Sequence, residues 1–461
     1  MSLAISLAYL VAAVLFILGL RQLSSPRGAR RGNQTAAVGM VIALGATIPL
    51  LHFTTVGLVI VLIGIAIGAP IGALTARRVH MTAMPQMVAI FNGVGGGAAA
   101  LVAVTELLDQ GMHPAFALAF PSVLSIVIGG VSFAGSVVAF SKLQGLLTGT
   151  PMTYPGQQVV NGLIALAIIA LAVAVLTAGS VPAFFVALLI LALVLGVAFV
   201  LPIGGADMPV VISLLNAFTG LAVAASGFVL NNFALIVAGT LVGASGTLLT
   251  KLMSDAMGRS LANVLFGAFG QVVAGPAGVA GAEGKSVRSG SPEDVGTMLA
   301  YARKVIIVPG YGLAVAQAQH AARELADELE RRGVDVEYAI HPVAGRMPGH
   351  MNVLLAEANV PYEQLKEMDE INDEFKFTDV ALVVGANDVV NPAARNAPGS
   401  PIYGMPILNA DEAKNIVFMK RSMRPGFAGI DNELLYDPKT IMLFGDAKDS
   451  LTKLVAAVKA V

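Results

Sequence analysis

Long runs of hydrophobic residues, separated by short polar segments, fill the first half of the chain. Nine such runs lie near residues 2–20, 36–52, 55–75, 84–107, 115–140, 159–178, 181–202, 208–229 and 233–252. About 20 helical residues cross the ~30 Å hydrocarbon core of a bilayer, so the pattern predicts nine transmembrane helices. The run at 36–52 is the weakest because Pro49 and His52 lie at its end.

The Lys and Arg residues of this half lie only in alternate connections between the predicted helices. They are Arg21, Arg27, Arg30, Arg31, Arg77, Arg78, Lys142, Lys251 and Arg259, whereas the connections near 53–54, 108–114, 179–181 and 230–232 contain none. Because basic residues concentrate on the cytoplasmic side, we expect the N-terminus outside and the C-terminal half in the cytoplasm. The first helix is not expected to be a cleaved signal peptide, since its basic residues follow it.

Four polar residues in or beside these helices are candidates for a functional path. Asn92 and Asn216 lie at matching depth, about 12 Å from the cytoplasmic side. Ser245 lies about 10 Å from the cytoplasmic end of the ninth helix, and Asp207 precedes the eighth. Ionisable or polar groups at such depth are functional candidates. Alternatives stay open: Asn92, Asn216 and Ser245 could bond across helices, and Asp207 could cap its helix. Asp207 and Asn216, nine residues apart, fall on nearly opposite faces of a regular helix.

Glycines four residues apart, Gly93 with Gly97 and Gly239 with Gly243, predict closely packed membrane helices. The run Asn92–Gly97 superficially resembles a phosphate-binding loop. It lies inside an apolar helix with no strand before it, so no nucleotide site is expected there.

The chain becomes polar after residue 253. Gly, Ala and Ser dominate 274–291, which predicts a linker at 254–290 between a membrane domain of residues 1–253 and a second domain of residues 291–461. The second domain opens at Ser291, followed by a proline and two acidic residues, the pattern of a helix start.

A dinucleotide-binding pattern follows. A strand predicted at 304–309 leads into Gly310, Gly312 and Ala316, then into one helix to about Arg332 and a second strand at 334–340. In this pattern the first glycine permits a tight turn, the second lets the backbone approach a pyrophosphate, and the third small residue allows close helix packing.

Further strands are predicted at 380–384, 416–419 and 441–444, with helices between them. The fold class is therefore an α-helical polytopic membrane domain followed by an α/β Rossmann-like, doubly wound parallel sheet. Asn387 and Asp388 follow the strand at 380–384, at the sheet edge where ligands bind in this class.

The charges near the strand ends favour NADP(H) over NAD(H). An NAD(H) site has an acid near the end of the second strand, where this chain has His341, with Glu337 inside the strand and Arg346 beyond it. A later strand is followed by three cations and a hydroxyl, supplied by Lys420, Arg421, Ser422 and Arg424. Such side chains suit a 2′-phosphate. Lys420 and Arg421 could instead form a solvated strand end, and His341 could be structural.

Composition supports two different modules. Hydrophobic residues make up 56% of the chain and charged residues 12%, and no Cys is present. The lack of Cys excludes disulfides, thiolate metal sites and cysteine nucleophiles, so redox chemistry requires a borrowed cofactor. Residues 1–260 hold nine basic and four acidic residues, and the remainder nineteen and twenty-five. No basic patch indicates a nucleic-acid partner, and no metal site is expected.

Several motifs resemble those of the beta subunit of proton-translocating NAD(P) transhydrogenase. They are Ala206–Asn216, Pro309–Gln319, His341–Ala358, Gly385–Asp388, Lys420–Met423 and Leu443–Lys448. The resemblance implies hydride transfer between NAD(H) on a partner alpha subunit and NADP(H) on this chain, coupled to proton movement across a bacterial inner membrane. It also implies that the assembled enzyme is a dimer.

The resemblance implies roles for individual residues. Cofactor-binding positions are Gly310, Tyr311, Gly312, Ala316, His341, Arg346, Asn387, Asp388, Lys420, Arg421, Ser422, Gly426 and Phe427. Among them Lys420 and Arg421 match the 2′-phosphate positions, Asp388 is the catalytic candidate near the nicotinamide, and Gly426–Gly429 matches a lid. The proton path would include Asn92, Asp207, Asn216 and Ser245.

Two positions depart from the family pattern. Some members have His where this chain has Asn92, and an asparagine does not take up a proton, so the protonatable group could lie on a partner helix. Phe427 replaces a frequent Tyr in the lid. A membrane transporter or channel gated by NADP(H) is the alternative function, although the sequence shows no carbonyl filter or ring of acids.

Overall fold

The computed structural model describes residues 3–50, 54–80, 83–109, 115–148, 152–178, 181–204, 207–256, 286–345, 349–397, 400, 402–426 and 428–461. The chain divides into two compact units. We call Met1–Ile203 with Val211–Thr250 the membrane unit, and Gly204–Val210 with Lys251–Val461 the sheet unit.

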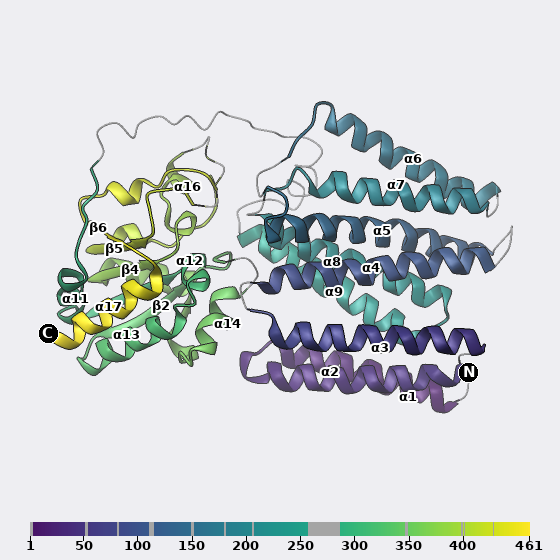
Figure 1. Cartoon of the computed structure of the whole chain (residues 1–461), viewed down its shortest axis with the longest axis horizontal. Coiled ribbons are helices and arrows are strands. Elements are labelled where there is room, and N and C mark those ends of the chain that lie inside the picture. The colour runs from purple at the N-terminus through teal and green to yellow at the C-terminus, as the bar shows by residue number, and fades with distance from the viewer. Residues whose placement is uncertain are drawn as a thin grey trace. The chain divides into compact units, whose positions relative to one another are not determined.

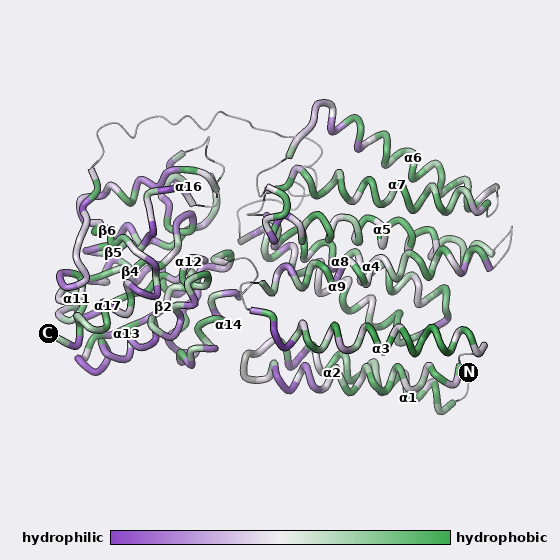
Figure 2. Tube along the Cα trace, in the orientation of Figure 1, coloured by the Kyte–Doolittle hydropathy of each residue, from purple (hydrophilic) through white to green (hydrophobic). Residues whose placement is uncertain are grey.

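Nine of the described helices are long and apolar enough to span a membrane, which confirms the predicted number. They are α1 (Leu3–Leu23), α2 (Pro26–Thr47), α3 (Thr55–Arg78), α4 (Met84–Asp109), α5 (Phe116–Gln144), α6 (Gln157–Ala178), α7 (Pro182–Val200), α8 (Met208–Val229) and α9 (Phe233–Ala256). Figure 1 shows them as long coiled ribbons, and Figure 2 shows that they are mostly hydrophobic, apart from a hydrophilic end of α2.

The second helix differs from its predicted range of 36–52. It begins ten residues earlier, at Pro26, and ends at Thr47, followed by a short 3-10 turn over Ile48–Leu50. Proline suits the first turn of a helix because its missing N–H has no partner there. The polar residues that follow Pro26 therefore extend the helix beyond its apolar part.

Glycines bring the membrane helices into close contact, as predicted. A Cβ on Gly239 of α9 would overlap the backbone of Ala224 on α8, and a Cβ on Gly97 of α4 would lie 2.9 Å from the Phe133 ring of α5. The run Asn92–Gly97 lies within α4, so it is a packing surface of a helix and not a nucleotide loop. Backbone approach of this kind stabilises helix pairs in a bilayer through van der Waals contact.

The sheet unit contains a six-stranded, all-parallel sheet in the order β3-β2-β1-β4-β5-β6. The strands are β1 (Lys304–Pro309), β2 (Asp335–Ile340), β3 (Leu365–Glu367), β4 (Val380–Val384), β5 (Asn415–Lys420) and β6 (Thr440–Phe444). This order is the one of doubly wound dinucleotide-binding sheets, and it confirms the predicted fold class. The three-residue edge strand β3 was not predicted.

Helices accompany the first and last strands. They are α11 (Pro292–Ala300), α12 (Tyr311–Val315), α13 (Gln319–Arg331), α14 (His350–Glu357) and α17 (Ala447–Ala460), with the four-residue α15 (Met368–Ile371) and α16 (Ala393–Asn396). The Ser291 hydroxyl accepts from the Asp294 amide at 3.1 Å, which confirms the predicted start of α11. In the described part of the chain, the connections from β4 to β5 and from β5 to β6 contain only helical turns of three or four residues, shorter than expected.

The single helix predicted from the glycine turn to Arg332 is two helices. Gln317 has φ of 50°, and the Ala318 amide donates to Leu313 O while the Gln317 amide donates to Ala314 O, both at 3.1 Å. These two bonds around a left-handed residue form a Schellman C-cap. They end α12 after five residues, and α13 begins at Gln319.

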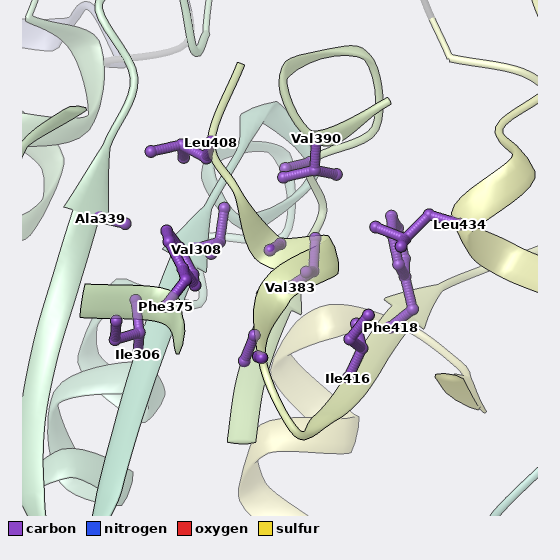
Figure 3. Close-up of a cluster of buried hydrophobic side chains, with 14 of the residues drawn as sticks. Ile306, Val308, Ala339, Phe375, Val383, Val390, Leu408, Ile416, Phe418 and Leu434 are labelled. Carbon is purple, nitrogen blue, oxygen red and sulfur yellow. The ribbon is translucent and has the colours of Figure 1, made fainter. Parts of the chain in front are cut away.

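Buried side chains of the central strands form the core of the sheet unit. Ile306 and Val308 of β1, Val383 of β4, and Ile416 and Phe418 of β5 belong to one cluster, drawn in Figure 3. Because these strands are covered on both faces, they are continuous apolar runs, as buried parallel strands generally are.

The predicted linker at 254–290 lies mostly outside the described residues, which resume at Ser286. Its last residues pair with β6: the Gly290 amide donates to Met442 O at 3.0 Å, and the Met442 amide donates to Arg288 O at 2.7 Å. The outer edge of β6 is therefore covered by chain that precedes α11.

Candidate functional site

Two glycine turns meet where β1 and β4 end. The Gly310 amide donates to Val384 O and the Gly312 amide donates to Gly385 O, both at 2.9 Å. A Cβ on Gly310 would overlap the backbone of Ala386, and Gly385 has φ of 67°. Only glycine permits both the close approach and the left-handed backbone. The order of the sheet reverses at β1 and β4, and ligands bind in the crevice at such a point.

A cavity of about 290 Å³ lies at this edge of the sheet. Its lining residues are Gly312, Gly385, Ala386, Asn387, Met419, Lys420, Arg421, Ser422, Arg424, Pro425, Gly426, Gly445 and Ala447. The structure thus brings together the glycine turn after β1, the polar loop after β4 and the cations after β5. These three segments were predicted separately from the sequence.

Lys420 is held within this cavity by two oxygen atoms. Its Nζ donates to Asn387 Oδ1 at 3.1 Å and to the carbonyl oxygen of Arg424 at 3.0 Å. Burial lowers the pKa of Lys420, and the charges of Asp388 and Asp431 act in the opposite direction. Neither Arg421 nor Arg424 forms an ion pair with any described residue. The cavity therefore presents cations that can bind phosphate oxygens.

Asp388 connects the loop after β4 to the segment after Gly426. Its Oδ1 accepts from Asn387 Nδ2 at 3.0 Å, and its Oδ2 accepts from the Ala428 amide at 2.9 Å. A Cβ on Gly426 would overlap the side chains of Asn387 and Asp388. Gly426 therefore allows this segment to lie directly on the two side chains. The predicted lid residue Phe427 lies outside the described residues.

His341 does not line the cavity. It is buried, its Nε2 donates to Pro406 O at 2.8 Å, and its Nδ1 accepts from the Val343 amide at 3.2 Å. This pattern assigns the neutral tautomer with the proton on Nε2, and burial lowers the pKa of His341 to about 4. These contacts favour the structural interpretation of His341 over a cofactor contact.

Three other predicted positions flank the glycine turn or lie beyond it. Tyr311 begins α12, and its ring lies edge-on to that of His350 with 6.2 Å between centroids. Ala316 caps the C-terminus of α12. Neither is among the residues that line the cavity, and Arg346 lies outside the described residues.

Gly385, Gly445 and Ala447 line the cavity; they lie within motifs that the sequence analysis singled out, but they were not predicted as cofactor-binding residues. Gly385 and Gly445 each follow a predicted strand directly. Because the carboxyl ends of parallel strands meet at one edge, their positions were a usable signal. Ala447 begins α17 two residues later.

The membrane unit contains a cluster of uncharged polar side chains between α4, α5 and α8. Asn92 Nδ2 donates to Ser136 Oγ at 3.0 Å and to Ser132 Oγ at 3.3 Å. Ser132 and Thr219 share a hydroxyl hydrogen bond of 2.6 Å. The buried Asn92 Oδ1 has no hydrogen-bond partner among the described residues. Asn92 thus joins three helices, as the cross-helix interpretation predicts.

Within the described residues, neither Asn216 nor Ser245 is hydrogen-bonded to this cluster. Asn216 is half-buried on α8, and Asp207 directly precedes that helix. Ser245 is exposed on α9 and donates only within its own helix, to Val242 O at 3.2 Å. Ser132 and Ser136 were not predicted, although their spacing places both on one face of α5.

Comparisons with known proteins agree on one family. The family model of the NAD(P) transhydrogenase beta subunit matches residues 5–457. A similar curated protein is "NAD(P) transhydrogenase subunit beta" of Rhodospirillum rubrum, 52% identical over 459 residues that cover 98% of each chain. The protein of the same name from a specified strain of that species gives the same identity and coverage.

Proposed function

The chain belongs to the NAD(P) transhydrogenase beta subunit family, and we propose that it binds NADP(H) in the cavity at the carboxyl edge of its sheet. In this proposal NADP(H) exchanges a hydride with NAD(H) held by an alpha subunit, and the exchange is coupled to proton movement through the membrane unit. The predicted domain boundaries, 1–253, 254–290 and 291–461, are part of the proposal.

The observation that carries the proposal is the meeting of a glycine double turn and a cation cluster in one cavity. The turn at Gly312 and Gly385 offers backbone that a pyrophosphate can approach. Lys420, Arg421 and Ser422 offer donors for a 2′-phosphate. These two features, held in one cavity, fit a phosphorylated dinucleotide.

The end of β2 favours NADP(H) over NAD(H). The acid within β2, Glu337, forms an ion pair with Lys304 at 2.8 Å, and Lys304 begins β1. The carboxylate of Glu337 is therefore paired toward the amino-terminal end of the strands, whereas the cavity lies at their carboxyl ends. His341, which follows β2, is held by backbone groups. Both side chains thus have partners within the chain, which supports the preference for NADP(H).

The nicotinamide rings supply the hydride chemistry of this reaction, so the protein needs no acid or base for that step. The residues of the protein bind and orient the dinucleotide, and they exclude water from it. Asp388, held between Asn387 and the Ala428 amide, is proposed to orient the nicotinamide end. Tyr311, Ala316, Arg346 and Phe427 remain proposed cofactor contacts.

For the membrane unit we propose that protonation near Asn216 shifts the sheet unit between a cofactor-releasing and a transfer-competent state. Asn92, Asp207 and Ser245 are proposed to lie along the same path. A proton moving down 100 mV releases about 2.3 kcal/mol, equivalent to roughly a fifty-fold shift in an equilibrium. If Asn216→Leu left proton-linked turnover unchanged, this part of the proposal would be wrong.

The proposed location is a bacterial inner membrane, with the N-terminus outside and the sheet unit in the cytoplasm. The alternation of basic connections supports this orientation. The partner is proposed to be an alpha subunit that binds NAD(H), in a dimeric assembly.

The test is a titration of the full chain in detergent with NADPH and with NADH, followed by fluorescence. Preference for NADPH, lost in K420A and R421A, supports the site. Equal or stronger binding of NADH would contradict it. Binding of NADPH without hydride exchange, when an NAD(H)-binding alpha subunit is added, would favour the NADP(H)-gated transporter.

A further inference from the structure

Two buried asparagines join the loop after β4 to the chain that follows Ala428. Asn432 Nδ2 donates to the carbonyl oxygen of Asn387 at 3.1 Å, and Asn391 Nδ2 donates to the carbonyl oxygen of Asp431 at 3.0 Å. Asn391 is 0% exposed and Asn432 is 1% exposed. Each segment thus contributes one amide donor and one backbone acceptor, and the two segments are tied at two points.

The oxygen atoms of both side chains are also used. Asn432 Oδ1 accepts from the Leu434 amide and Asn391 Oδ1 accepts from the Ala393 amide, both at 3.0 Å. Both side chains are therefore fixed in one orientation, because an exchanged amide would leave buried groups unpaired. A buried polar group that loses its partner destabilises the fold, so these hydrogen bonds favour one arrangement of the two segments.

The hydrogen bond from Asn432 ends on Asn387, the residue whose side chain accepts from Lys420. Asn387, whose carbonyl oxygen accepts from Asn432, uses its side chain to accept from Lys420 Nζ and to donate to Asp388 Oδ1. Asn387 has φ of −146° and ψ of −67°, which is neither helical nor extended. The bond from Asn432 restrains the Asn387 backbone, and the Asn387 side chain that accepts from Lys420 is attached to that backbone.

We infer that Asn432 and Asn391 are positioning residues of the nucleotide cavity, acting through Asn387 on Lys420. The inference rests on the proposed NADP(H) site. Neither asparagine lines the cavity, and the side-chain atoms of both are bonded to other parts of the chain. Their effect is to hold the Lys420 ammonium and the Asp388 carboxylate at fixed positions before the dinucleotide binds.

The test uses the full chain in detergent, NADPH as the probe, and the substitutions Asn432→Ser and Asn391→Ser. Serine retains an oxygen that can accept from the Leu434 or Ala393 amide, as capping serines do, but it removes the long amide donor. We expect each variant to bind NADPH roughly ten-fold more weakly, the equivalent of about 1.4 kcal/mol. We also expect faster amide hydrogen exchange at Ala428.

Asn372→Ser is the matched control. Asn372 Nδ2 donates to Ile407 O at 3.1 Å and Asn372 Oδ1 accepts from the Asn409 amide at 3.0 Å. It thus makes the same pair of bonds in the same unit, and none of these residues lines the cavity. We expect N372S to bind NADPH within two-fold of the unsubstituted chain.

A double-variant cycle separates positioning from general loss of structure. If Asn432 acts through Lys420, N432S in a K420A background binds NADPH no more weakly than K420A alone. Additive losses, unchanged binding in N432S, or an equal loss in N372S would each overturn the inference. If N432S does not fold, the same cycle is measured with N391S and K420A, and its result tests the inference. Failure of the unsubstituted chain to bind NADPH would instead refute the proposed function.

Discussion

The amide of Gly312 donates to the carbonyl oxygen of Gly385 at 2.9 Å, which joins the first turn after β1 to the first turn after β4. This bond lies at the point where the sheet order reverses, and both glycines line the cavity. A side chain on either turn would separate the two segments, since a Cβ on Gly312 would lie 2.7 Å from Gly385 Cα.

Gly310→Ala is therefore expected to destabilise the sheet unit by about 1–3 kcal/mol, as overpacking does, and to abolish NADPH binding. The added Cβ overlaps the backbone of Ala386, which cannot move without displacing β4. Thermal unfolding and NADPH titration of the full chain measure both effects. Gly162→Ala is the control, because nothing lies within 4 Å of that Cβ. An unaltered G310A would show that the turns are not in contact.

Acid is expected to destabilise the sheet unit through His341. Burial lowers the pKa of His341 to about 4, from an ordinary value of 6.5. The unfolded chain therefore binds a proton between these values while the folded chain does not. His341 stabilises the fold fully above about pH 6.5, and this contribution is lost as the pH falls toward 4. The loss is of the order of 3 kcal/mol.

His341→Asn provides the comparison for this pH effect. Asparagine can accept from the Val343 amide but does not titrate. Unfolding of the sheet unit, followed by calorimetry from pH 7.5 to 4.5, should show a steeper loss of stability in the unsubstituted chain than in H341N. Parallel pH profiles would contradict the prediction, because they would show that the pKa of His341 is the same in the folded and the unfolded chain.

Lys142→Met is expected to loosen the end of α7. Lys142 lies near the end of α5, and its Nζ donates to the carbonyl oxygen of Leu201 and to that of Ile203, the latter at 2.8 Å. Methionine has similar length but no donor, so two backbone oxygens lose their partner at about 1–3 kcal/mol each. Helix loss on heating, measured by circular dichroism, tests this. The exposed Lys251→Met should unfold as the unsubstituted chain does, and equal melting of both variants would contradict the prediction.

The orientation of the membrane unit can be tested with single cysteines, because the chain has none of its own. Ser24→Cys lies between α1 and α2, and Leu230→Cys follows α8. In intact cells a membrane-impermeant maleimide is expected to label L230C and to spare S24C. In inverted vesicles the pattern should reverse. The opposite result would place the N-terminus in the cytoplasm.

Much of the fold could be predicted because hydrophobic burial leaves a direct pattern in the sequence. The strand β4 has its predicted bounds, since a continuous apolar run ends sharply at Asp379 and Gly385. The break at Gln317 could not be predicted, because a left-handed C-cap normally has glycine. The strand β3 has three residues, too few for a pattern, and depends on pairing with β2.

In the candidate site too, residues that follow a sequence pattern could be predicted, and residues that depend on tertiary contacts could not. Lys420, Arg421 and Asn387 could be found because each follows a strand, and strand ends share one edge. Asn432 could not, because its role depends on a tertiary hydrogen bond to Asn387, 45 residues away in sequence. Ser245 was predicted on the same polar path as Asn92 from its depth in the membrane, but depth does not determine which face of a helix is buried.

Both edges of the sheet are short or covered. β3 has three residues, and β6 is paired at Met442 with Arg288 and Gly290. An open edge strand is a template on which a second chain can add its own strand, the first step toward fibres. This sheet offers no long template of that kind within the described residues. Many copies can therefore accumulate side by side on one membrane without growing into a shared sheet.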